Sequence, residues 1–167
     1  MSLFPDDVVM LASQTLEALR RAGLRGASAE SLTGGLIAGA LTEIAGSSDC
    51  IGRSFVTYSN AAKHDVLGVP EAVLAAHGAV SAETVTCMAE GVLRVAGSDA
   101  DIAVAVSGVA GPGGGSAEKP VGTVYLAVAS RNGATETMHK VYPGDRAEVR
   151  MATVRDALWL MKARAEQ

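Results

Sequence analysis

The chain has 167 residues, a formal net charge of −4 and a pI near 5.3. An acidic chain is a poor candidate for direct nucleic-acid binding, because such binding needs basic residues that displace counterions from phosphates. Hydrophobic residues make up 49% of the sequence, which excludes a disordered protein. No apolar stretch approaches the roughly 18 residues of a membrane span, so we expect no membrane insertion.

The amino-terminal residues and the cysteines indicate the compartment. Residues 1–7 lack the basic and apolar regions of a signal peptide. The two cysteines, Cys50 and Cys87, form no Cys-x-x-Cys pair and are too few for a disulfide framework. We therefore expect a single cytoplasmic domain over residues 1–167.

The first half of the chain alternates between helical and strand patterns. Apolar residues recur at helical spacing in several segments, and glycines follow most of them as stop signals. The elements predicted in this half are a helix over 6–22, a strand over 24–30, a helix over 31–45, a strand over 54–59, and helices over 60–66, 70–77 and 81–96.

The second half changes to strands. A continuous apolar run over 102–106 is typical of a strand covered on both faces. Strands over 121–129 and 135–141 are joined by a hairpin turn at Arg131, Asn132 and Gly133. A last helix starts near Asp145. This order predicts an α/β fold, a three-layer α/β/α sandwich with a mixed, mostly parallel sheet and a late β-hairpin.

A serine and two glycines follow the first predicted strand. Ser31 lies where the strand gives way to a helix, so free backbone N–H groups around Thr33 and Gly34 can hold an oxyanion or a phosphate. The alternative is that Ser31 or Thr33 merely caps the helix.

A lysine lies in the next polar segment. If Asn60 caps the short helix, Lys63 is its third residue, and both the helix dipole and burial would lower the pKa of the lysine. Such a lysine is a usable general base, and Tyr58 could relay its proton. The alternative is a solvated surface lysine beside a packed tyrosine.

Glycines and arginines in the second half suit an anionic ligand. The loop over 107–116 follows a buried strand, and its glycines let backbone N–H groups approach a ligand closely. Arg146 and Arg150 lie four residues apart near a helix start, which favours a phosphate. The alternatives are a flexible loop, and arginines that pair with an acid such as Glu148. The three histidines are scattered without metal-ligand spacing, so we expect neither a metal nor another cofactor.

Five blocks of the sequence resemble, in the same order, the CinA carboxy-terminal domain family, the nicotinamide-nucleotide amidases. They include Ala-Glu-Ser-Leu-Thr-Gly-Gly, where the family commonly has cysteine in place of Leu32. They also include Ser-Gly-Val-Ala-Gly-Pro-Gly-Gly-Gly, the most specific of the five. The blocks lie within residues 29–35, 56–69, 78–91, 107–124 and 144–146.

The resemblance implies an α/β/α fold, no metal, and hydrolysis of the amide of nicotinamide mononucleotide. We expect Ser31 to be the nucleophile, Lys63 to accept its proton, and Tyr58 to relay or orient. The residues expected to bind the substrate are Thr33, Gly34, Ser48, Gly111, Gly113, Gly114 and Arg146.

Two other functions are compatible with parts of the sequence. A nucleotide- or phosphate-binding module without turnover would need the glycines and arginines but not a paired Ser31 and Lys63. An accessory protein of competence or DNA repair is the other alternative, although the net charge opposes direct DNA contact. We expect a small nucleotide as the partner, no nucleic acid and no membrane, and a symmetric homo-oligomer.

Overall fold

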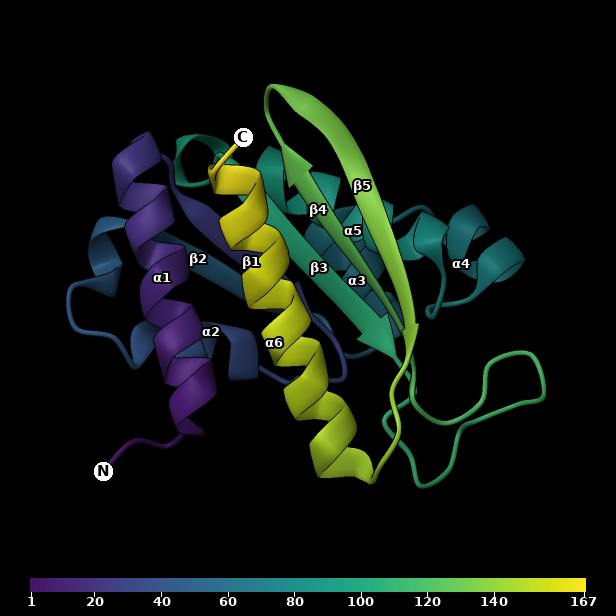
Figure 1. The fold of residues 1–167 in the computed structure, drawn as a ribbon. Helices are drawn as coiled ribbons and strands as arrows, with labels where there is room; N and C mark the ends of the chain where they lie inside the picture. The colour runs from purple at the N-terminus through teal and green to yellow at the C-terminus, as the bar shows by residue number, and fades with distance from the viewer.

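Five strands form one mixed sheet in the order β2-β1-β3-β4-β5 (Figure 1). The computed structural model describes all residues from 1 to 167. Strand β1 runs parallel to β2 and to β3, whereas β4 runs antiparallel to both β3 and β5. Four of the five strands therefore point the same way, which confirms the predicted mixed, mostly parallel sheet with its late hairpin. The strands are β1 (Gly26–Glu30), β2 (Ile51–Val56), β3 (Ile102–Gly108), β4 (Thr123–Ser130) and β5 (Gly133–Val141).

Helices cover both faces of this sheet, so the predicted three layers are confirmed. Helices α1, α2 and α6 lie on one face, and α3 and α5 lie on the other, with α4 packed against α5. No helix combines the length and the apolar character needed to cross a membrane. The helices are α1 (Asp6–Ala22), α2 (Leu36–Thr42), α3 (Asn60–Leu67), α4 (Glu71–His77), α5 (Ala82–Ala96) and α6 (Arg146–Ala165).

Strand β3 separates the two halves of the core. Its large side chains Ile102, Val104 and Val106 pack with α1, α2 and α6. Its alternate residues Ala103 and Ala105 face α5 on the other side. Because both faces are covered, the strand is a continuous apolar run rather than an alternating one.

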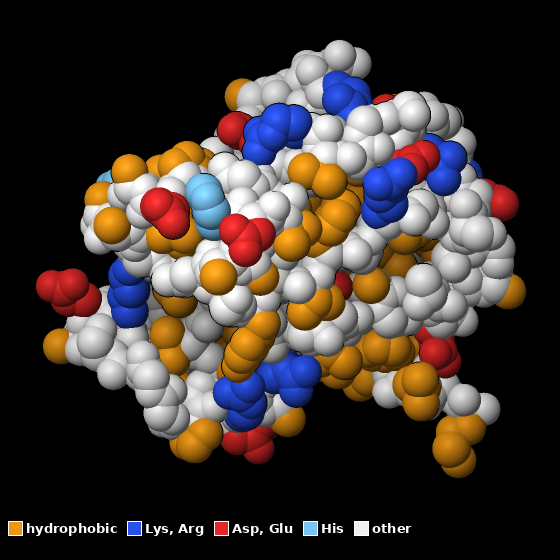
Figure 2. Space-filling view, turned by 180° about the vertical axis from the view of Figure 1, so that it is seen from behind, with side chains coloured by type: hydrophobic (Ala, Val, Ile, Leu, Met, Phe, Trp, Pro, Cys, Tyr) orange, Lys and Arg blue, Asp and Glu red, His pale blue; other side chains and the backbone are white.

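Charged side chains are dispersed on the side of the molecule that α4 and α5 cover. Figure 2 shows this side, where lysines and arginines alternate with acidic and apolar groups and do not gather in a basic stripe. This face therefore lacks the continuous basic surface that would displace counterions from a nucleic acid.

Several boundaries differ from the sequence-based expectation. Helix α2 begins at Leu36 rather than near Ser31, because residues 31–35 form turns. Strand β2 lies earlier than residues 54–59, since its parallel register with β1 pairs Ile51 with Gly26. The cap of α3 is Ser59, whose hydroxyl accepts a hydrogen bond from the amide of Ala62 at 3.0 Å.

A glycine in α5 lets the end of α3 pack closely against α5. A Cβ atom on Gly91 would lie far inside van der Waals contact with the carbonyl oxygen of Leu67, at the end of α3. The same carbonyl accepts a hydrogen bond from Arg94 at 2.7 Å. Helix α3 is therefore fixed at both ends, by the Ser59 cap and by this contact with α5.

We predict that Gly91→Ala destabilises the protein by about 1–3 kcal/mol, the usual cost of overpacking a core. At an open helical position the same change stabilises by about 1 kcal/mol. Gly39→Ala in α2 is the control, because its Cβ would meet only the ring of Phe4 at 3.1 Å, near the chain terminus. Urea unfolding of both variants measures the difference. A Gly91→Ala variant at least as stable as the wild type contradicts the packing argument.

Candidate active site

Polar side chains meet at the carboxyl edge of β1 and β3. Ser31 follows β1 and Ser107 lies near the end of β3, and these two strands are parallel neighbours. They line a cavity of about 220 Å³ together with Lys63, Tyr58 and Arg146. The crossovers from β1 to β2 and from β2 to β3 use opposite faces of the sheet. Such a switch point opens the crevice in which open α/β sheets bind their ligands.

The amine of Lys63 is buried and surrounded by three oxygen acceptors. Its Nζ donates to Ser31 Oγ at 3.0 Å, to the carbonyl of Thr57 at 2.7 Å and to the carbonyl of Tyr58 at 3.2 Å. The residue is only 1% exposed, which rules out the alternative of a solvated surface lysine. Burial lowers the pKa of Lys63 from 10.5 to about 8.

The position of Lys63 in its helix differs slightly from expectation. With Ser59 rather than Asn60 as the cap, Lys63 is the fourth residue of α3 and not the third. The predicted direction of the pKa shift is correct, and desolvation by burial is its cause.

A buried carboxylate organises the turn that carries Ser31. Both oxygens of Glu30 are fully buried acceptors. One accepts from the hydroxyl of Ser28 and from the amide of Ala38, and the other from the hydroxyl of Thr33 and the amides of Gly35 and Ile37. Glu30 therefore satisfies the first free amides of α2, and neither Ser31 nor Thr33 acts as the helix cap.

Two backbone amides next to Ser31 have no acceptor in the protein. The amide of Gly34 donates to the carbonyl of Ser31 at 3.1 Å, so it is committed to the turn. The expectation that it holds an oxyanion is therefore wrong. The amides of Leu32 and Thr33, which follow Ser31 directly, make no hydrogen bond within the chain and are free to donate to an oxyanion.

A second cavity, of about 640 Å³, adjoins the first. The two share Ala110 and Arg146. Arg146 donates from Nη1 to the carbonyl of Gly111 at 2.8 Å, and Arg150 also lines the second cavity. The amides of Arg146 and Ala147, in the first turn of α6, also lack an acceptor. Free amides at a helix start and two guanidinium groups make this cavity suitable for a phosphate.

One alternative was that Arg146 and Arg150 pair with an acid such as Glu148, and the structure does not show this pairing. Glu148 instead completes a capping box with Asp145 at the start of α6. Both arginines donate to backbone carbonyls, so no carboxylate neutralises their charge. Gly113 and Gly114 are exposed and line neither cavity, and Gly111 contributes its carbonyl rather than its amide.

Tyr58 and Ser48 lie in positions that do not fit the roles predicted for them. Tyr58 is 65% exposed and its hydroxyl makes no hydrogen bond within the chain, whereas its carbonyl accepts from Lys63. Ser48 lies in a short turn just before β2, at the amino edge of the sheet and therefore opposite the cavity. Its predicted place in the site is wrong, because parallel strands put the residues before β2 beside the start of β1.

The sequence patterns predicted no role for Glu30, Leu32 or Ser107. Glu30 is recognisable as the one charged residue at the end of a small-sided segment that becomes a buried strand. Ser107 likewise ends the apolar run of β3. The amide of Leu32 left no signal, because a backbone donor has no side-chain identity.

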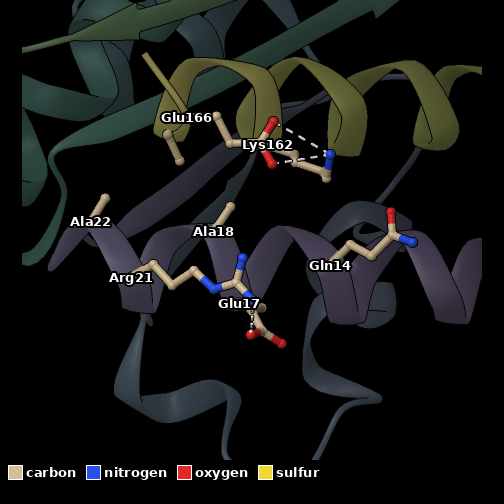
Figure 3. A pocket seen from close by; sticks show the side chains of 8 residues that line it. Gln14, Glu17, Ala18, Arg21, Ala22, Lys162 and Glu166 are labelled. Carbon is tan, nitrogen blue, oxygen red and sulfur yellow. Dashed lines mark hydrogen bonds and ion pairs between the residues drawn. The ribbon is translucent and has the colours of Figure 1, made fainter.

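A further hollow lies between α1 and α6, and it shares no lining residue with the two cavities described above. It measures about 440 Å³, and Figure 3 shows its lining side chains. The charged residues pair with one another, Arg21 with Glu17 and Lys162 with Glu166. No uncompensated charge is therefore left to attract a ligand.

The fold and the cavity define an α/β/α protein with a buried serine–lysine pair at the switch point of its sheet. The sequence model of the protein family described as the CinA C-terminal domain matches residues 9–165. The chain belongs to the CinA C-terminal domain family, as the resemblance of the five blocks predicted.

Similar proteins fall into short and long forms. The chain is 57% identical over 134 residues to nicotinamide-nucleotide amidohydrolase PncC of Enterobacter agglomerans, with 80% of each protein covered. It is 51% identical over 150 residues to a CinA-like protein of Akkermansia muciniphila, but spans only 36% of that protein. The crystal structure of the competence/damage inducible protein CihA from Agrobacterium tumefaciens superposes over the full length of both chains, with a TM-score of 0.95 and 52% identity.

We predict that the Lys63 amine titrates near pH 8, because its burial disfavours the charged form. Carbon-13 NMR of ε-labelled lysines follows this titration directly. The assignment comes from a Lys63→Met variant, whose spectrum must lack the shifted resonance. A Lys63 resonance that stays unchanged up to pH 9.5 would contradict the prediction.

Proposed function

We propose that the chain is an amidase that hydrolyses nicotinamide mononucleotide to nicotinic acid mononucleotide and ammonia. Ser31 is the nucleophile and Lys63 is the base. The 57% identical relative carries the name nicotinamide-nucleotide amidohydrolase, which supports the substrate. The single observation that carries the mechanism is the 3.0 Å contact between Lys63 Nζ and Ser31 Oγ in a buried site.

The three acceptors around Lys63 determine where its lone pair points. Two of them are carbonyls, of Thr57 and Tyr58, and a carbonyl can only accept. When the amine loses a proton, its two remaining N–H groups stay on these carbonyls. The lone pair then faces the Ser31 hydroxyl, the only one of the three partners that can donate. Tyr58 thus orients the base through its backbone, and this supports the orienting role rather than the relay.

The reaction follows from this arrangement. Ser31 Oγ attacks the carboxamide carbon while its proton moves to Lys63 Nζ. The amides of Leu32 and Thr33 hold the oxyanion of the tetrahedral intermediate. The C–N bond then breaks, and Lys63 gives its proton to the departing nitrogen, which leaves as ammonia. Water attacks the resulting ester, Lys63 accepts one of its protons and returns it to Ser31 Oγ, and the acid product leaves.

The two adjoining cavities match the two ends of the substrate. The carboxamide lies against Ser31 in the smaller cavity, and the phosphate lies in the larger one between Arg146 and the start of α6. Arg146 borders both, so a single molecule can reach from the phosphate to the nucleophile. Arg146 is exposed, and its guanidinium has further N–H groups besides the one that donates to the carbonyl of Gly111.

We place this activity in one cytoplasmic domain over the whole chain, and we propose that no nucleic acid is a partner. The two cysteines are unpaired, in keeping with a reducing compartment. We also propose that the protein is a homo-oligomer, because symmetric assemblies are common among soluble enzymes.

We predict that Ser31→Ala lowers kcat by at least about 10³-fold, as loss of a nucleophile usually does. Nucleotide binding and thermal stability should change little, because a hydroxyl is a small part of the contact. Ser48→Ala is the matched control, since Ser48 lies at the opposite edge of the sheet. Ammonia release from the mononucleotide is the measurement. More than a tenth of wild-type kcat in Ser31→Ala would overturn the covalent mechanism.

We predict that Lys63→Arg is as inactive as Lys63→Ala, because a guanidinium stays protonated at any working pH. In the wild type, kcat/KM should rise with pH through about 8, since the amine must be neutral to accept the proton. Lys140→Arg, on the exposed strand β5, should retain full activity. A Lys63→Arg variant with wild-type turnover would show that another group is the base.

A further inference from the structure

Arg150 connects the two cavities through the nucleophile turn. It extends from the second turn of α6 and lines the larger cavity. Its Nε donates to the carbonyl of Leu32 at 2.9 Å, and its Nη2 donates to the carbonyl of Thr33 at 3.2 Å. Arg150 is therefore the side chain of α6 that touches both the larger cavity and the residues that follow Ser31.

The bond to Leu32 acts on an oxyanion donor directly. The carbonyl of Leu32 and the amide of Thr33 belong to one planar peptide unit, in which C=O and N–H point in opposite directions. A guanidinium that holds this carbonyl also sets the direction of the Thr33 amide. That amide has no acceptor in the protein, so Arg150 alone fixes its peptide plane from the carbonyl side.

The guanidinium of Arg150 remains available to an anion. Its Nη1 makes no hydrogen bond, and no ion pair involves this residue. The acid that lines the larger cavity is Asp145, and its carboxylate is occupied with the amide of Glu148 in the capping box. A dianion in the larger cavity therefore gains a charge-assisted partner that is already half-buried.

We propose that Arg150 is a positioning residue through which a bound phosphate dianion orders the Thr33 amide, one of the two oxyanion donors beside Ser31. The inference rests on the proposed amidase function and extends it to the source of its specificity. An anion on Nη1 restrains the guanidinium, and the restrained guanidinium holds the Leu32–Thr33 peptide plane. The phosphate thereby raises kcat, not only substrate affinity, because remote binding energy is used at the reacting centre.

Arg146 provides the contrast. It donates to Gly111 and borders both cavities, but it makes no hydrogen bond to residues 31–35. It can bind the dianion without transmitting anything to the turn. Loss of Arg146 should therefore weaken binding of the dianion, whereas loss of Arg150 should remove its effect on catalysis.

The test separates the dianion from the substrate. Nicotinamide riboside lacks the phosphate, and phosphite supplies the dianion as a separate molecule. We expect saturating phosphite to raise kcat/KM of the riboside by about 10-fold or more, the equivalent of one charge-assisted hydrogen bond. Arg150→Lys should abolish most of this activation at saturation, because an ammonium cannot bond two carbonyls and an anion in the same plane. Arg146→Lys should need more phosphite but reach activation similar to the wild type.

A second measurement does not depend on any variant. In the wild type, phosphite should shift the NMR resonance of the Thr33 amide and slow its hydrogen exchange. If phosphite binds yet leaves both riboside turnover and this amide unchanged, the coupling is overturned. The same holds if a folded Arg150→Lys variant, checked by its melting temperature, keeps full activation.

The outcomes also distinguish this inference from the proposed function. If the wild type releases ammonia from the mononucleotide but phosphite never activates the riboside, only the role of Arg150 falls. If the wild type releases no ammonia from the mononucleotide, the amidase proposal falls and the coupling falls with it.

Discussion

The burial of one amine governs the arrangement of the site. Lys63 loses nearly all its contact with water, and the carbonyls of Thr57 and Tyr58 and the hydroxyl of Ser31 replace the lost hydration. These acceptors come from the segment after β2 and the turn after β1. The parallel pairing of β1 with β2 brings them together, and a hydrogen bond from the Thr57 amide to the Glu30 carbonyl at 2.8 Å extends this pairing to the cavity.

Two opposite charges hold the nucleophile turn from two sides. The carboxylate of Glu30 accepts from the Thr33 hydroxyl and the Gly35 amide, and the guanidinium of Arg150 donates to the carbonyls of Leu32 and Thr33. These contacts fix the turn, while the amides of Leu32 and Thr33 stay free of any acceptor in the protein. A turn fixed in this way needs little reorganisation when charge develops, which is the condition for strong electrostatic stabilisation.

Local signals predicted most of the fold and part of the site. Helical periodicity, glycine stops and the apolar run of β3 each depend on neighbouring residues, so the layers, the hairpin and most of the helices could be inferred from the sequence. Ser31 and Lys63 were separate candidates because each follows a predicted strand, and the family resemblance implied their pairing as nucleophile and base. The start of α2, the cap of α3 and the place of Ser48 in the site were wrong. Strand register decides at which edge of the sheet Ser48 lies, and the carboxylate of Glu30 binds the amides that open α2. The cap of α3 was wrong by one residue, because the hydroxyl of Ser59 rather than the side chain of Asn60 accepts the first free amide.

The sequence by itself determined the α/β/α layers, the family and the residue types available for chemistry, because these follow from local pattern and composition. Only the tertiary structure decided which groups of those residues meet. It selected the carbonyl of Tyr58 over its hydroxyl, the amide of Leu32 over that of Gly34, and a positioning contact for Arg150. The physical reason is that backbone donors and acceptors carry no sequence identity. Their directions are set by turns and strand register, which involve residues more than a hundred positions apart, as between Arg150 and Leu32.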